Sequence, residues 1–273
     1  MRAIKHPQIS IWNDLEMKIH EAAIEAEYNL KYLSPFENFT EIFDDFEPQK
    51  VTRILPDFFS KVYKVHRILA YYRKSDKICS LLRKITNQMV NGSLNYLNSD
   101  GEFCEADNLK LIQKFNDCIS LNESYHNAYN EKFKEKLDKT FIFEKFDAFS
   151  SRCSKLILIF KTIDDFDHLK NCEIKEMSLI AEYFVQNINF TLKLNNKQIL
   201  DLKNKEFEKD FENFKSQCVI EDSKIRQIIS KRFQLTKTVL IEIKLHKTLK
   251  ETVTRKEGQL ELDLWFKHCL KRF

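Results

Sequence analysis

The chain has 273 residues, of which 43% are hydrophobic and 12% aromatic, so it carries enough apolar surface for a packed core. It contains only three glycines and four prolines, whereas phosphate-binding loops and dinucleotide-binding turns need several glycines at fixed offsets. Charged residues make up 32% of the chain but the net charge is only +4. No long basic run is present, so the composition argues against nucleic-acid binding.

The first clear element begins at Ser34. Ser34 can cap a helix, Pro35 suits its first position, and Glu37 can complete a capping box. Four phenylalanines then recur at intervals of three and four, which predicts a short amphipathic helix that stops at Pro48. They are Phe36, Phe39, Phe43 and Phe46.

Apolar residues at helical spacing from Val51 to Met89 predict one long helix or two in series. The stretch 91–101 contains two Gly-centred turn signals and predicts a break. A second stripe, 143–163, predicts about six turns of helix whose aromatic face is internal core.

The segment 239–245 alternates as a strand would, yet we assign it to helix because a lone strand would leave its backbone unpaired. Gly258 predicts the last break, before a final helix over 260–273. The expected fold is therefore all-α, an elongated series of helical bundles. We place one bundle at 1–97, a turn-rich linker at 98–107 and further bundles at 108–273.

The seven cysteines are scattered without a C-x-x-C pair, as expected of buried thiols in a reducing compartment. They are Cys79, Cys104, Cys118, Cys153, Cys172, Cys218 and Cys269. The longest strongly apolar run, Leu156 to Phe160, is too short to span a membrane. We therefore expect no membrane association, and a location in the cytoplasm or a cilium.

Candidate metal ligands are few. His168 and Cys172 stand four apart on one helical face, but no second pair accompanies them, and the adjacent His268 and Cys269 point to different faces. The other histidines are isolated: His6, His20, His66, His126 and His246. We predict no catalytic, cofactor-binding or metal-binding residue.

An aspartate cluster at Asp164, Asp165 and Asp167 invites comparison with the D-D-x-x-D motif of all-α isoprenoid synthases. The third aspartate comes one residue early and a second motif is absent. A solvated helix face is the simpler interpretation.

Several strings in order resemble the N-terminal tail region of dynein heavy chains. Residues 7–12 (PQISIW) resemble the family's opening helix, and 25–33 resemble its E-A-x-D-N-x-K-Y-L signature, with Tyr28 in place of aspartate. Residues 71–88 are similar to its Y-Y-N-T-x-x-R-M-x-x-L-L-x-K-I-x-N-Q run, with Arg73-Lys74 in place of Asn-Thr.

The strongest likeness is at 142–166, which resembles I-F-G-K-F-D-x-F-x-x-R-x-x-K-L followed by F-x-T-I-x-x-F, with Glu144 in place of the glycine. Residues 207–214 are similar to the F-x-x-D-x-x-x-F segment beyond. The replaced residues mark a divergent member.

The resemblance implies helical bundles that assemble dynein heavy chains with each other, with WD-repeat intermediate chains and with light chains. It implies a non-catalytic scaffold in the cytoskeleton of a ciliary axoneme, associated with microtubules only indirectly. The ATPase motor would lie far downstream, so we expect either a segment of a longer heavy chain or a tail-only protein. The alternatives are an unrelated all-α adaptor and an all-α small-molecule enzyme.

Overall fold

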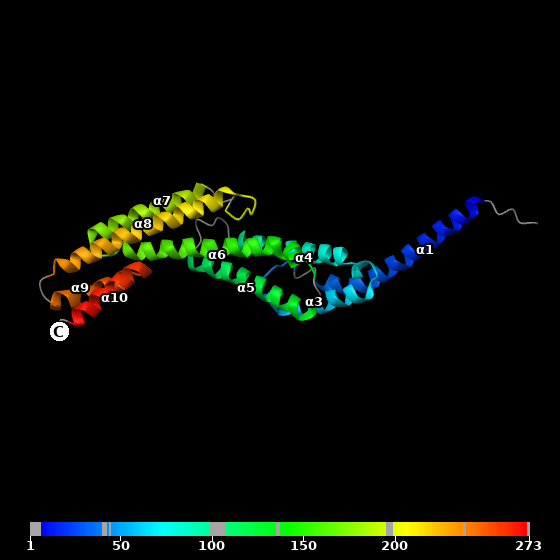
Figure 1. Cartoon of the computed structure of the whole chain (residues 1–273), viewed down its shortest axis with the longest axis horizontal. Coiled ribbons are helices and arrows are strands. Elements are labelled where there is room, and N and C mark those ends of the chain that lie inside the picture. Colours follow the sequence, from blue (N-terminus) through cyan, green and yellow to red (C-terminus); the bar gives the residue numbers. More distant parts are fainter. Residues whose placement is uncertain are drawn as a thin grey trace, which may run out of the picture. The chain divides into compact units, whose positions relative to one another are not determined.

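The computed structural model describes residues 7–39, 43, 45–98, 108–134, 137–194, 199–236 and 239–271. Within these ranges the chain forms nine α-helices and two short 3₁₀ helices (η), and no strand (Figure 1). The all-α prediction is therefore confirmed. The helices are α1 (Pro7–Leu33), α3 (Pro48–Ile68), α4 (Ser75–Asn98), α5 (Asn108–Lys132), α6 (Lys139–Leu169), α7 (Lys175–Leu194), α8 (Glu206–Gln234), α9 (Val239–Thr252) and α10 (Lys256–Leu270), with η1 (Ser34–Phe39) and η2 (Tyr71–Arg73).

The chain divides into two compact units. Unit 1 falls within Met1–Tyr96 and Asp117–Ser150, and unit 2 within Leu97–Asn116 and Ser151–Phe273. The domain limits expected from the sequence stay a prediction, and residues 99–107 of the expected linker lie outside the described residues.

Aromatic rings make up much of the core of unit 1. Phe59 of α3 packs edge-on against Tyr125 of α5, with ring centroids 4.9 Å apart. The Tyr125 hydroxyl lies 3.2 Å from the hydroxyl of Thr86 on α4, which satisfies both buried groups. Burial raises the pKa of Tyr125 well above its ordinary value. Three helices therefore meet at one satisfied polar contact inside an apolar core.

The expected break at 91–101 is wrong in its first part, because α4 continues through Asn91 and Gly92 to Asn98. The Phe46 ring lies so close to Gly92 that a Cβ there would overlap it. Glycine at this position thus serves close packing of a ring on a helix, and does not mark a turn.

Two other local expectations need correction. Ser34 does not begin a new α-helix, since η1 follows α1 directly and the Ser34 hydroxyl donates back to the Lys31 carbonyl at 3.2 Å. Pro48 ends the phenylalanine pattern as predicted and also starts α3, where its missing N–H costs nothing. Of the four phenylalanines, Phe39 and Phe46 are buried.

In unit 2, α8 packs against both α7 and α10. Phe184 of α7 stacks on Phe166 of α6 at 4.0 Å, and Phe233 of α8 stacks on Trp265 of α10 at 5.5 Å. The helix expected over 239–245 is confirmed as part of α9. Gly258, expected at a break, lies inside α10, where a Cβ would overlap Val253.

Candidate interaction surface

Helix α1 carries an apolar stripe on solvent-exposed positions. Every side chain from Ile11 to Ile24 is exposed, and Trp12 retains 66% of its accessible surface. At 100° per residue, seven of the exposed apolar side chains share one face about a third of the circumference wide, while Met17, Ile24 and Tyr28 lie outside it. This face, here called the α1 stripe, consists of Ile11, Trp12, Leu15, Ile19, Ala22, Ala26 and Leu30.

The sequence explains why α1 forms without a covering core. Pro7 occupies the first helical position and no glycine or proline follows within the helix, while alanine, glutamate and lysine favour helix. Asp14 and Lys18 pair one turn apart at 2.8 Å, which adds a few tenths of a kcal/mol. Asn29 also lies toward the stripe, and its buried Oδ1 has no hydrogen-bond partner among the described residues.

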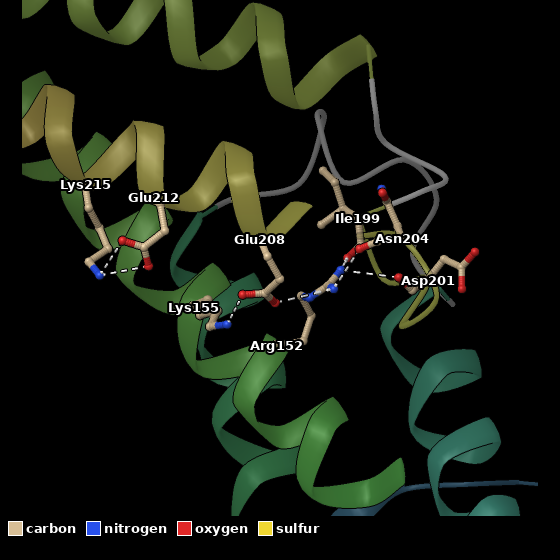
Figure 2. Close-up of polar contacts among 8 residues, drawn as sticks. All are labelled: Arg152, Lys155, Ile199, Asp201, Asn204, Glu208, Glu212 and Lys215. Atoms are coloured by element: carbon tan, nitrogen blue, oxygen red, sulfur yellow. Dashed lines mark hydrogen bonds and ion pairs between the residues drawn. The ribbon is translucent and has the colours of Figure 1, made fainter. Parts of the chain in front are cut away.

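A second notable feature, in unit 2, is a buried arginine. Arg152 of α6 directs its guanidinium at the loop before α8 (Figure 2). Its Nη1 donates to the carbonyls of Ile199 at 2.7 Å and Asp201 at 3.4 Å, and its Nη2 to that of Asn204 at 3.4 Å. One side chain thus anchors the 199–204 loop to α6.

Hydrogen bonds between side chains and the backbone also form within the 199–204 loop and at its end. The Asp201 carboxylate accepts the Lys203 amide at 2.9 Å, and the Asn204 side chain accepts the Glu206 amide at 3.0 Å. Short acceptor side chains that bind the backbone two residues ahead are typical of turns. The loop therefore presents the carbonyls of Ile199, Asp201 and Asn204 to Arg152.

Charges and an aromatic ring complete the arginine's surroundings. Glu208 of α8 lies 3.7 Å from Nη2 and also pairs with Lys155 (Figure 2). The guanidinium also covers the Phe207 ring, 3.8 Å from its centroid. Burial lowers the pKa of Arg152, and the Glu208 and Asp201 charges partly oppose this. With its donors occupied by protein carbonyls and Glu208, Arg152 is suited to anchoring a loop and not to binding a ligand.

A third polar group joins α6, α8 and α10. Arg255 forms a two-pronged bond to Asp222 at 2.9 and 2.6 Å and donates to the Thr162 hydroxyl at 3.3 Å. Burial alone would lower the pKa of Arg255, but the Asp222 hydrogen bonds and charge raise it overall. This partly buried pair is satisfied within the protein.

Among the residues that the structure describes, the histidines and cysteines considered from sequence are not brought together. His168 is exposed and Cys172 is buried as a free thiol. His66 contacts the Tyr72 carbonyl, and His126 contacts Asp147 at 2.8 Å. His6 lies outside the described residues. Across the described ranges, no group of three or more His, Cys, Asp or Glu side chains could hold a metal ion.

The aspartates of 164–167 have separate partners. Asp164 accepts from Asn108 at 2.6 Å, Asp165 lies 3.8 Å from Arg255, and Asp167 pairs with Lys170 at 2.6 Å. Carboxylates engaged with three different partners do not form the shared acidic face that a magnesium–diphosphate site needs.

In the described part of the chain, no helix is both long and apolar enough to cross a bilayer.

Neither the exposure of the α1 stripe nor the loop contacts of Arg152 can be predicted from the sequence. Periodicity does not reveal exposure, because an apolar helix face has the same spacing whether it is covered or bare. An arginine between Phe149 and Leu156 on an apolar stripe was the available signal, since a charge on a buried face needs partners.

Comparison with known proteins places this helical chain in a family. The sequence matches the family described as "Dynein heavy chain, N-terminal region 1" over residues 1–273. The chain therefore belongs to this family, and the region it represents is the N-terminal tail and not the ATPase motor.

Individual relatives agree. The chain is 25% identical to mouse "Dynein axonemal heavy chain 8" over 81% of its length and 27% identical to mouse "Dynein axonemal heavy chain 5" over 78%. It is 28% identical to "Dynein gamma chain, flagellar outer arm" of Chlamydomonas reinhardtii over 76% of its length. The chain spans about 5% of the length of each of these relatives.

Proposed function

We propose that this chain is a non-catalytic scaffold of an axonemal dynein, which holds subunits of a ciliary motor complex together. The observation that carries the proposal is the match to the N-terminal tail family over the whole chain. Relatives named axonemal and flagellar support a place in the cytoskeleton of a cilium. Association with microtubules would then be indirect.

The α1 stripe is the proposed assembly surface. Exposed apolar side chains along several helical turns cost free energy in water, and contiguous patches of this kind mark interaction sites. The proposed partners are dynein heavy chains, WD-repeat intermediate chains and light chains.

Absence of catalysis belongs to the same proposal. The sequence lacks the glycine-rich phosphate loops. The two arginines described above, Arg152 and Arg255, each form their hydrogen bonds with groups of the protein itself. We expect no ATP hydrolysis and no nucleotide-dependent rise in melting temperature, because a ligand that binds the native state must raise it. Saturable binding of Mg-ATP at micromolar concentration would instead favour the alternative that the chain is an all-α enzyme.

The test is capture of partners from axonemal extract by the tagged chain, identified by mass spectrometry. Wild type should recover dynein heavy or intermediate chains. A Leu15→Asp/Ile19→Asp variant, which places charges on the α1 stripe, should lose them, whereas Lys18→Gln on the same helix should keep them. If the wild-type chain recovers no dynein subunit, the alternative that it is an unrelated all-α adaptor protein would be favoured.

A further inference from the structure

A buried histidine lies where α9 meets α10. His246 of α9 keeps only 6% of its accessible surface, and its ring stacks on Phe266 of α10 with centroids 4.3 Å apart and planes 19° from parallel. Its Nε2 is buried and has no hydrogen-bond partner among the described residues. A neutral imidazole can leave one ring nitrogen without a proton, whereas an imidazolium carries a proton on both.

Protonation would therefore place a charged N–H group in an apolar contact without an acceptor. Leaving a buried charge unpaired is far more costly than leaving a neutral group unpaired. Parallel stacking on Phe266 gives a neutral ring good apolar contact, and the described structure places no acceptor at Nε2. The geometry thus favours the neutral form of His246.

The charged groups around the imidazole do not remove this preference. Lys250, one turn later on α9, opposes protonation, while Asp263 of α10 favours it. Glu242, one turn earlier, is buried and accepts the Thr236 hydroxyl at 3.2 Å. On α8, Arg226 pairs with α10 through Glu257 at 3.4 Å and Glu261 at 3.8 Å.

We propose that His246 makes the packing of α9 on α10 acid-sensitive, so that proton uptake at this one ring loosens the C-terminal end of unit 2. The device is a property of the fold and goes beyond the assembly role proposed above. It stands or fails independently of which partners the chain binds.

The direction with pH follows from linkage. Burial first, and Lys250 second, lower the pKa of His246 below its ordinary value of 6.5. Above that ordinary value both folded and opened forms are neutral, and the full stability is present. As pH falls below it, the opened form binds the proton first, so stability declines until the folded-state pKa is passed. In that window the equilibrium constant for opening rises by about tenfold for each unit by which the pH falls.

A tryptophan on α10 makes the effect measurable. The chain contains two tryptophans, Trp12 and Trp265, so Trp12→Phe leaves Trp265 as the only one. Urea unfolding of the whole chain in this background is followed by Trp265 fluorescence at about pH 7.5 and about pH 5.5. The midpoint should be lower at the acidic pH.

Two variants identify the responsible ring. His246→Phe keeps an aromatic stack on Phe266 and cannot titrate, so it should remove most of the drop. His20→Gln, on exposed α1, should leave the drop unchanged. An equal drop in His246→Phe would overturn the proposal.

A measurement on the wild-type chain keeps the test decisive if His246→Phe does not fold. The ring proton resonances of His246, assigned by their loss in His246→Gln, should titrate below about pH 6.5. Titration at or above that value would also overturn the proposal, because the folded state would then bind the proton at least as well as the opened one.

Discussion

Single side chains in this protein decide local geometry through contacts with the backbone. Arg152 illustrates this, because its guanidinium donates to three loop carbonyls while lying over Phe207. A planar group with a fixed fork of donors can meet several acceptors at once, which a lysine ammonium cannot do in the same way.

We therefore predict that Arg152→Lys destabilises the chain by about 1–3 kcal/mol although the charge is kept, because loop carbonyls lose their donors. Lys161→Ala, on an exposed position of the same helix, should stay within about 0.5 kcal/mol. Urea unfolding gives the stability, and limited proteolysis should cut near 199–204 faster in Arg152→Lys. Unchanged proteolysis would mean that the loop is held by other contacts.

Gly92 provides a second prediction at this scale. Alanine usually stabilises a helix interior relative to glycine by about 1 kcal/mol. Here the new Cβ would overlap the Phe46 ring, and overpacking costs about 1–3 kcal/mol. Gly92→Ala should therefore be destabilising in thermal or urea unfolding, while Asn95→Ala on the exposed side of α4 should not. A stabilised Gly92→Ala would show that Phe46 moves aside freely.

At the scale of elements, helix existence followed closely from sequence, because long apolar stripes leave few alternatives. The 143–163 stripe became the buried face of α6, with Phe146 and Phe149 fully buried. Helix breaks were predicted at Gly92 and Gly258, but both glycines lie inside helices. Periodicity cannot reveal that the Phe46 ring and Val253 pack against these glycines. The exposure of α1 was equally out of reach, because an apolar helix face looks the same whether covered or bare.

The buried face of α6 gives a prediction about core and surface. Phe149→Ala should cost about 3–5 kcal/mol, a large part of a domain's stability, and should reduce partner binding only through unfolding. Leu15→Asp on the α1 stripe should behave in the opposite way, with stability kept and binding lost. Urea unfolding and a partner-capture assay on both variants check this. If the Phe149→Ala chain is stable but no longer binds, the α6 face that contains Phe149 is an exposed docking surface and is not part of the core.

At the scale of the whole molecule, the chain is a set of helices whose polar clusters serve packing and whose exposed apolar face, the α1 stripe, is the proposed assembly surface. Family membership could be predicted from sequence because the resembling strings are spread in order from residue 7 to residue 214. The packing role of residues such as Arg152 could not, since it depends on a loop about 50 positions away in the sequence.

The most direct test of the central claim is the behaviour of the tagged chain in ciliated cells. Wild type should enter the axoneme and fractionate with dynein heavy chains, while the Leu15→Asp/Ile19→Asp variant should be made at the same level and remain outside. A wild-type chain that stays out of the axoneme, or that enters it equally well with charges on the α1 stripe, would contradict the account.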